Sequence, residues 1–291
     1  MLRCSECTLE FCDPMEYEKA SYDEAYKSGA ESGFYVPSVQ WLRDASPNLA
    51  EARWMLFSAQ IEALVWLKSN RGDATILDVG CGPGWFLIRA KQLGFEVNGV
   101  EIGSEPVRAL REKGYDVVCG SVESAPQEWS PQVVTVFEVL EHLPDPVKFL
   151  QQIKRRFPQA QLIVTVPSPR RWTKAGKHRD LADFPPNHLT RWNPYSLMRA
   201  LSLAGYAKLE VSYSKPIALE TASVSIRGLW HSWRDQMPDR LADANIGGPL
   251  RRLKREVVVR RLKCVPGFFC SSFFRLMGWS GISMLAIATP Q

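Results

Sequence analysis

An aspartate and three closely spaced glycines stand together in the stretch ILDVGCGPGW (76–85). Asp78 is followed by Gly80, Gly82 and Gly84, and the residues after them have the pattern of a helix. Glycines at this spacing let a backbone turn sharply and approach a ligand closely. The residues around the glycines therefore decide which ligand the turn can bind.

Two phosphate-binding interpretations fail on the residues that follow the glycines. A Walker-type loop continues with Lys and then Ser or Thr, which reach phosphate and metal, but Gly84 is followed by Trp85 and Phe86. A dinucleotide fingerprint needs a small sixth residue so that helix and strand pack tightly. The sixth residue is Trp85 when counted from Gly80 and Leu87 when counted from Gly82, and neither is small. The turn is therefore not typical of either phosphate site.

Two carboxylates favour a ligand that has no phosphate. Asp78 would repel a pyrophosphate, but it can hold an ammonium group directly or through water. Glu101 ends the next apolar segment, where a carboxylate can accept hydrogen bonds from both hydroxyls of a ribose. A ligand with an α-amino group, a ribose and an adenine meets both demands. The sequence therefore predicts S-adenosylmethionine as the cofactor.

Alternating strands and helices must position these residues. Apolar strand patterns occupy 74–80, 95–101, 115–120, 132–140, 161–168 and 206–214, and helical patterns occupy 49–68, 85–94, 104–114, 145–157 and 193–205. Gly94 and Gly114 are expected to end two of the helices. Apolar strands separated by helices predict a parallel sheet covered on both faces, in a doubly wound α/β fold. Ligands of such sheets bind at the carboxyl ends of the strands, where 80–85, Glu101, 120–122 and 137–142 would meet.

The motifs ILDVGCGPGWFL, GVEIGSEPV, VCGSVES and VVTVFEVLEHLPDP resemble the class I S-adenosylmethionine-dependent methyltransferases. Within that family they are similar to the branch of ubiquinone-type O-methyltransferases and sugar or natural-product methyltransferases. The resemblance covers about residues 46–215, and GISMLAIATP resembles the antiparallel last strand of the fold. It implies a Rossmann-like, seven-stranded, mostly parallel sheet. The implied activity is methyl transfer to a small-molecule, lipid or glycan acceptor, with oxygen favoured as the acceptor atom.

The resemblance also implies roles for particular residues. Asp78 and the turn from Gly80 to Gly84 would line the methionine part, and Glu101 would hold the ribose. Ile102 would lie against the adenine, while Val122 would offer it a backbone N–H. Many relatives have an Asp that accepts from the adenine amino group where this chain has Ser121. The complete predicted cofactor set is Asp78, Gly80, Cys81, Gly82, Gly84, Trp85, Glu101, Ile102, Ser121, Val122, Phe137 and Glu138.

A hydroxyl acceptor needs a base that removes its proton while donor and acceptor are held in line. The chain has four histidines, and His142 and His188 are the catalytic candidates because each follows a strand at the expected ligand edge. His178 is a weaker candidate, and His231 has no such position. Trp172, Phe184 and Trp192 flank the loop of His188 and would form walls for the acceptor, or part of the core.

Two alternatives stay open. Glu138, Glu141 and His142 could, with His188, assemble a divalent-metal site that polarises a catechol-like acceptor, although no residue is assigned as a metal ligand. The second alternative is a non-catalytic or protein-directed S-adenosylmethionine-binding protein that acts through a basic C-terminal surface. Nucleic-acid base methylation is disfavoured, because residues 138–141 read EVLE in place of an Asn/Asp-Pro-Pro-aromatic motif.

The two ends of the chain divide it into three parts. Residues 1–45 form an N-terminal arm in which Cys4-Ser-Glu-Cys7 has the spacing of half a zinc site, and RCSECTLEFCDP resembles the second half of a zinc ribbon. Residues 46–215 are the expected core. Residues 216–291 contain a loop, a basic and apolar helical pattern, and the final strand. Cys81 and Cys119, in apolar runs, are expected to be reduced and buried.

The charge of the chain is unevenly distributed. The net charge is +5, and seven basic residues lie in RRLKREVVVRRLK (251–263). The following apolar run, 264–279, falls short of the roughly 20 residues that a membrane span needs, so peripheral membrane contact is possible but spanning is not expected. The first residues contain no apolar core of signal-peptide length. We therefore expect a cytoplasmic protein.

Overall fold

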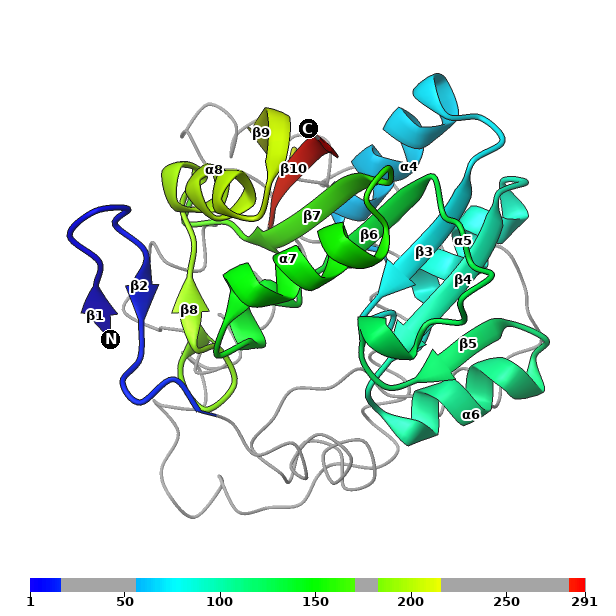
Figure 1. Cartoon of the computed structure of the whole chain (residues 1–291), viewed down its shortest axis with the longest axis horizontal. Coiled ribbons are helices and arrows are strands. Elements are labelled where there is room, and N and C mark those ends of the chain that lie inside the picture. Colours follow the sequence, from blue (N-terminus) through cyan, green and yellow to red (C-terminus); the bar gives the residue numbers. More distant parts are fainter. Residues whose placement is uncertain (17–55, 171–182, 216–282, 291) are drawn as a thin grey trace, which may run out of the picture.

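A seven-stranded sheet forms the centre of the molecule (Figure 1). The structure is a computed structural model, and it describes residues 1–16, 56–170, 183–215 and 283–290. The strand order is β5-β4-β3-β6-β7-β10-β9. The strands are β3 (Thr75–Val79), β4 (Glu96–Glu101), β5 (Asp116–Cys119), β6 (Val133–Phe137), β7 (Gln161–Pro167), β9 (Tyr206–Tyr213) and β10 (Ser283–Pro290). Strand β10 pairs antiparallel with both β7 and β9, and the pairs among β3 to β7 are parallel. The predicted Rossmann-like sheet with an antiparallel last strand is confirmed.

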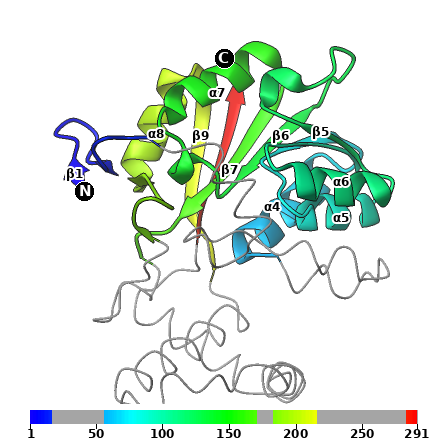
Figure 2. The ribbon, with the colours of Figure 1, turned by 90° about the horizontal axis from the view of Figure 1, so that it is seen from below.

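Helices cover both faces of this sheet (Figure 2). They are α4 (Ser58–Asn70), α5 (Trp85–Gln92), α6 (Ser104–Glu112), α7 (Pro146–Arg156) and α8 (Pro194–Leu203). One hydrophobic cluster joins α4, α5 and α6 to one face, and a second joins α7 and α8 to the other. No helix in the described ranges is long and apolar enough to cross a membrane.

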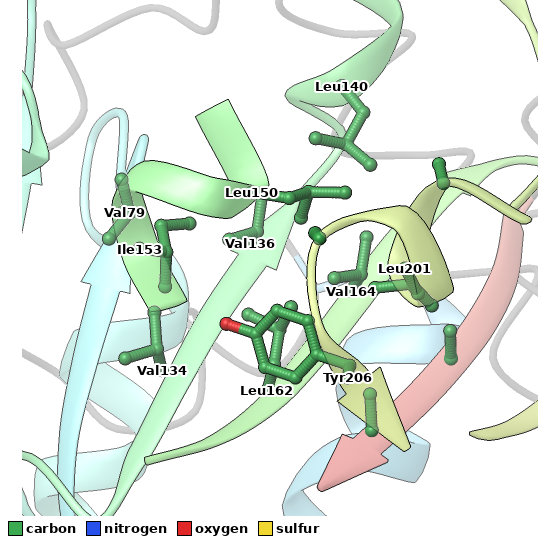
Figure 3. Close-up of a cluster of buried hydrophobic side chains, with 14 of the residues drawn as sticks. Val79, Val134, Val136, Leu140, Leu150, Ile153, Leu162, Val164, Leu201 and Tyr206 are labelled. Carbon is green, nitrogen blue, oxygen red and sulfur yellow. The ribbon is translucent and has the colours of Figure 1, made fainter. Parts of the chain in front are cut away.

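The central strands are buried on both faces, which explains their near-continuous apolar sequences. Figure 3 shows the cluster beneath α7 and α8, in which side chains of β6 and β7 meet those of both helices. Its labelled members include Val134, Val136, Leu150, Ile153, Leu162, Val164 and Leu201, all fully buried. Because a slip by one residue would turn every side chain to the other face, this packing fixes the register. The carboxyl ends of the strands are thereby fixed next to one another.

The described elements differ from the sequence predictions mainly at their ends. The strand predicted over 132–140 is shorter and ends at Phe137, because Glu138 turns the chain with a φ of 54°. A short 3-10 helix, η3 (Leu140–His142), follows. Gly94 and Gly114 have φ values of 90° and 76° and follow the C-cap residues of α5 and α6, as expected of helix-ending glycines. In the helix predicted over 49–68, the part before residue 56 lies outside the described residues.

A second, small sheet joins the N-terminus to the main domain. Strands β1 (Leu2–Arg3) and β2 (Glu10–Phe11) form an antiparallel hairpin, and β2 pairs with β8 (Thr190–Arg191). Residues 2–11 are called the N-terminal hairpin below. No pattern in the sequence predicted this pairing, because strands of two residues have too few positions for a recognisable periodicity.

The cysteines of the described residues are all free thiols. Cys81 is buried as predicted, but Cys119 is exposed. The prediction for Cys119 was wrong because β5 is an edge strand, so its last residue lacks a neighbour on one side. Cys4 and Cys7 lie in the turn of the N-terminal hairpin, where backbone N–H groups of Cys7 and Glu6 lower the pKa of Cys4. Zinc binding by this pair stays a prediction.

Candidate active site

The glycine turn connects β3 to α5 and depends on glycine at several positions. Gly80, Gly82 and Gly84 have φ values of 78°, 51° and 75°, which side chains rarely tolerate. A Cβ atom on Gly80 would lie 2.5 Å from Cγ2 of Val139, and one on Gly84 would lie 2.4 Å from Cδ2 of Leu110. Backbone conformation and packing therefore both demand glycine at this edge of the sheet.

Glu101, at the end of β4, is hydrogen-bonded both to the glycine turn and to the loop between β4 and α6. One carboxylate oxygen accepts the N–H of Gly82 at 2.7 Å, and the other accepts the N–H of Gly103 at 2.8 Å. The residue is 5% exposed. Because a carboxylate offers about four acceptor sites, it can accept from ribose hydroxyls beside these two amides. Its place at the strand end was predicted, whereas its hold on the turn was not.

Asp78 lies inside the sheet, at the entrance to the glycine turn. It is 2% exposed, and its Oδ1 accepts a hydrogen bond of 2.7 Å from Oγ1 of Thr135 on β6. Burial raises the pKa of Asp78 to about 7, with a smaller raising effect from the charge of Glu101 and an opposing effect from Thr135. An ammonium group next to this carboxyl would favour its ionised form. Sequence reasoning missed Thr135, which lies far from Asp78 in the chain.

The remaining residues of the predicted adenine side follow β4 and β5. Ile102 comes directly after β4, and Val122 begins a 3-10 helix, η2 (Val122–Ser124), after β5. Val122 is completely buried. The hydroxyl of Ser121 donates to Oε2 of Glu123 at 2.8 Å. The sheet therefore brings these residues to the same edge as the glycine turn, as predicted.

Three residues of the predicted cofactor set, Cys81, Trp85 and Phe137, belong to the core. Trp85 and Cys81 are each 8% exposed and lie in the cluster beneath α4, α5 and α6. Phe137 packs edge-on against Phe86, with ring centroids 4.5 Å apart. All three residues are members of this hydrophobic cluster, and contact with a cofactor stays a prediction for them.

Glu138 is held in an unusual conformation directly after β6. Its φ of 54° lies in the left-handed region, which costs a non-glycine residue on the order of 1–3 kcal/mol. Its N–H donates to the carbonyl oxygen of Thr165 at 3.1 Å, with the Thr165 hydroxyl oxygen 3.2 Å away. Neighbouring β7 thus holds the turn that starts the segment carrying Glu141 and His142.

His142 and His188, the two catalytic candidates from the sequence, lie side by side at this edge. Their ring centroids are 4.8 Å apart in an edge-on arrangement. Nδ1 of His142 lies 2.6 Å from the carbonyl oxygen of Asn187. Because a carbonyl only accepts, that nitrogen carries the proton, which leaves Nε2 as the acceptor. Burial, and then the neighbouring His188, lower the pKa of His142 to about 4, so its ring is neutral at pH 7.

Two carboxylates flank the histidine pair. Oδ1 of Asp183 lies 3.5 Å from Nδ1 of His188, and Oε1 of Glu141 lies 4.0 Å from its Nε2. Oε1 of Glu141 also lies 3.9 Å from Nε2 of His142. Sequence reasoning missed Asp183, because no spacing connects it to the other residues. The pair therefore has carboxylates on both sides.

Glu141, His142 and His188 can each offer one ligand atom, and these atoms lie within 4.8 Å of one another. Two imidazoles and one carboxylate are ligands that zinc, manganese and iron accept. Although the sequence assigned no metal ligand, the geometry keeps the metal alternative open. Glu138, the fourth residue of that alternative, is outside this group.

The other residues considered for the acceptor pocket have different positions. Trp192 is 3% exposed and belongs to the cluster under α7 and α8, so it is a core residue. Phe184 is half-buried, and the guanidinium carbon of Arg191 lies over its ring, 4.1 Å from the ring centroid. Trp172, His178, His231 and the basic and apolar run over 251–279 lie outside the described residues.

A sequence model of the family described as "Methyltransferase domain" matches residues 49–211. The ubiquinone biosynthesis O-methyltransferase of Serratia proteamaculans is 40% identical over 88 residues, which cover 27% of this chain and 36% of that enzyme. The enzyme of the same name from Pseudomonas paraeruginosa is 35% identical over 100 residues, or 31% of this chain and 43% of its own length. The chain thus spans less than half the length of these curated relatives.

Solved structures also resemble the chain. A SAM-dependent methyltransferase from Archaeoglobus fulgidus superposes with a TM-score of 0.47 and 16% sequence identity, over 79% of this chain and 94% of that one. The magnesium protoporphyrin IX methyltransferase of Synechocystis, solved with bound SAH, has a TM-score of 0.48 and 15% identity, over 67% of this chain and 93% of that one.

Proposed function

The chain belongs to the methyltransferase-domain family, within the class I S-adenosylmethionine-dependent methyltransferases, and we propose that it transfers a methyl group from S-adenosylmethionine to a hydroxyl of a small-molecule, lipid or glycan acceptor. The observation that carries this proposal is the pair of buried carboxylates, Asp78 and Glu101, on either side of the glycine turn. A phosphate ligand would be repelled there, whereas a sulfonium ligand with an ammonium and a ribose is complementary.

The residues of the turn fit the cofactor for separate reasons. Asp78 would hold the ammonium group, and Glu101 would accept from the ribose hydroxyls. Gly82 and Gly84 leave the backbone without side chains where the methionine part would lie. The bound cofactor supplies an activated methyl group, so the protein has to orient the acceptor and receive its proton.

The histidine pair is the candidate for proton removal. Nε2 of His142 is an acceptor at neutral pH, because Nδ1 donates to the Asn187 carbonyl. Its pKa of about 4 makes it a weak base, whereas His188 lies between the carboxylates of Asp183 and Glu141. We therefore assign the base to His188 and an orienting contact with the acceptor to His142.

A divalent metal is the second candidate for acceptor activation, supported by the close approach of Glu141, His142 and His188. A catechol is a suitable probe, because a divalent metal can polarise its hydroxyl groups. With 3,4-dihydroxybenzoate and methyl-labelled cofactor, a metal-assisted enzyme loses turnover in a chelator and regains it with added manganese or magnesium. Activity that a chelator leaves unchanged would favour the histidine base.

Membrane contact through residues 251–279 belongs to the same proposal as a means of reaching a lipid acceptor. The seven basic residues in 251–263 would contribute roughly 1 kcal/mol each near an anionic surface. Co-sedimentation with phosphatidylserine vesicles should therefore occur at low salt and diminish at high salt, and neutral vesicles should not bind. Binding to a protein partner in place of vesicles would favour the protein-directed alternative.

Calorimetric titration with S-adenosylmethionine tests the proposed function directly. Glu101→Ala should weaken binding by roughly 1–3 kcal/mol, the scale of lost hydrogen bonds to a charged group. The matched control is Glu96→Ala, because Glu96 lies exposed at the opposite end of the same strand. Circular dichroism should confirm that both variants fold. Unchanged affinity in Glu101→Ala would remove the ribose assignment, and no binding by the wild-type protein would overturn the proposed function.

A further inference from the structure

We propose that the N-terminal hairpin and Asp183 are positioning elements of the methyl-transfer site, which together fix the direction of the His188 ring. The inference rests on the proposed function for its catalytic meaning, but the contacts that carry it are independent of any ligand. Neither the hairpin nor Asp183 is required to touch cofactor or acceptor. Figure 1 shows the hairpin beside β8, away from the strands that carry the glycine turn.

The hairpin is joined to β8 by backbone and side-chain contacts. Glu10 and Phe11 of β2 pair with Arg191 and Thr190 of β8. Beyond this ladder, the N–H of Cys12 donates to the carbonyl oxygen of Leu189 at 2.9 Å. The hairpin therefore covers the whole of β8, and Cys12 directly after it reaches the residue next to His188.

The turn of the hairpin is also held by Asn193, the N-cap residue of α8. Nδ2 of Asn193 donates to the carbonyl oxygen of Thr8 at 3.2 Å and lies 3.0 Å from the Thr8 hydroxyl oxygen. Thr8 has a φ of 59°, a conformation that costs a non-glycine residue on the order of 1–3 kcal/mol. The surroundings thus hold the hairpin in one defined conformation.

The opposite side of β8 contacts the segment that carries Glu141 and His142. The N–H of Leu189 donates to the carbonyl oxygen of Glu141 at 2.7 Å, and the hydroxyl of Thr190 lies 3.4 Å from the carbonyl oxygen of Leu140. Strand β8 is consequently placed between the hairpin and the candidate acid–base segment. A displacement of the hairpin would therefore be transmitted to His188.

Arg191 links the hairpin to Asp183. Its Nη1 lies 3.4 Å from Oε2 of Glu10, and its Nε donates to the backbone carbonyl oxygen of Asp183 at 3.1 Å. The guanidinium also stacks on Phe184. The Arg191 side chain is 17% exposed, so these contacts are partly shielded from water. A single side chain thus connects the hairpin to the start of the loop over residues 183–188.

Asp183 then acts on the ring of His188. Its carboxylate lies 3.5 Å from Nδ1 of His188, and it is itself 7% exposed. Asp183 lies closer to Nδ1 than Glu141 lies to Nε2, at 3.5 Å against 4.0 Å. The nearer carboxylate favours the tautomer with the proton on Nδ1, which leaves Nε2 as the acceptor on the side of Glu141. That is the orientation a base for a hydroxyl acceptor requires. Asp183 is thereby a positioning residue, because it acts through His188.

Histidine side-chain NMR tests this inference without an acceptor. In protein with ¹⁵N-labelled histidine, assigned with His188→Gln, wild-type His188 should show the Nδ1–H tautomer. Asp183→Ala should give a mixture of tautomers, while Asp183→Asn, which keeps a carbonyl acceptor, should restore most of the wild-type pattern. An Nε2–H tautomer in the wild type, or no change in Asp183→Ala, would overturn the role of Asp183.

Hydrogen exchange tests the part played by the hairpin. Glu10→Ala should speed amide exchange over residues 183–190, whereas Glu16→Ala, at an exposed carboxylate of the same arm, should not. Equal exchange in both variants would overturn the link through Arg191. The NMR and hydrogen-exchange results do not depend on S-adenosylmethionine binding. A failure of the proposed function can therefore be distinguished from a failure of this inference.

A catechol assay separates positioning from a merely structural role. With 3,4-dihydroxybenzoate as the probe, Asp183→Ala should lower kcat by up to about 100-fold, the cost of small misplacements of reacting groups, and leave the KM for S-adenosylmethionine unchanged. Glu10→Ala should lower kcat less. A raised KM for the cofactor with unchanged kcat would contradict the inference, because it would indicate a general loosening of the domain.

Discussion

Asp78, the proposed partner of the cofactor's ammonium group, occupies its position at the expense of stability. The Asp78 carboxyl is buried and accepts a hydrogen bond from the Thr135 hydroxyl, so it loses most of its hydration in the folded protein. The raised pKa of about 7 is the measure of that cost in the protein without ligand. A cationic ligand would remove it, so the site is expected to gain stability when it binds.

The pH dependence of stability follows from the sign of this shift. Between about pH 4 and pH 7, Asp78 keeps its proton in the folded protein but has lost it in the unfolded chain. This residue therefore lowers the free energy of unfolding as the pH rises through that range. Asp78→Asn should therefore raise the free energy of unfolding at pH 8 by up to about 4 kcal/mol and make no gain below pH 4. Urea unfolding at pH 3.5 and pH 8 measures this. A variant less stable than wild type at pH 8 would contradict the assignment.

Cofactor affinity should depend on the same proton. Since an ammonium group needs the ionised form of Asp78, binding of S-adenosylmethionine should strengthen as the pH rises from 6 to about 7. Thr135→Val removes the hydrogen bond that lowers this pKa, so the increase should move to higher pH. Thr75→Val, at the opposite end of β3, is the control. Calorimetric titration at pH 6, 7 and 8 measures the affinity for S-adenosylmethionine. The same pH dependence of affinity in wild type and Thr135→Val would exclude a link between binding and the Asp78 proton.

At the level of elements, the glycine turn is fixed by the helices packed over it. Gly84 precedes α5, and any side chain there would enter the space of the buried Leu110 on α6. Gly94 has an equally unusual φ of 90° but no heavy atom within 4 Å of an added Cβ. A side chain at Gly94 would therefore meet only backbone strain, whereas a side chain at Gly84 would meet the same strain and a clash with Leu110.

Alanine substitutions at these positions should differ accordingly. Gly94→Ala should cost about 1 kcal/mol for the left-handed conformation alone. Gly84→Ala should cost at least about 3 kcal/mol, because displacement of Leu110 adds to the same strain. Urea unfolding of both variants provides the comparison. Equal losses would show that α6 can move away from the turn.

The alternation of elements could be predicted from the sequence because buried strands and amphipathic helices have strong periodic patterns. Glu101 could be predicted because it ends a recognisable strand. The end of β6 could not, since nothing marks Glu138 as a residue with a positive φ. Asp183, Thr135 and the short strand β8 were missed because their partners are distant in sequence, and only the folded chain brings them together.

For the whole molecule, β10 is the strand that completes the sheet. Its central residues are buried between β7 and β9, and Ala286 is completely buried. Strand β9 pairs with β10 alone among the described strands. The integrity of one end of the sheet therefore depends on a strand that is distant in sequence from both of its neighbours.

A carboxylate introduced into β10 should lower stability far more at the interior of the strand than near its end. Ala286→Asp should abolish cooperative unfolding or lower stability by several kcal/mol, because it buries an unpaired carboxylate. Thr289→Asp, at a half-buried position near the end of the same strand, should cost far less. Thermal unfolding followed by circular dichroism compares them. Similar melting temperatures would show that β10 is dispensable.

The position of β10 has a consequence for how the chain folds during synthesis. Ser214, just after β9, bonds to Ser283, which is 69 positions later. Because β9 has β10 as its partner, it must wait for that whole stretch to leave the ribosome before it can join the sheet. An open sheet edge of this kind is prone to mispairing with other chains. The nascent protein is therefore expected to need protection by chaperones until its last strand emerges.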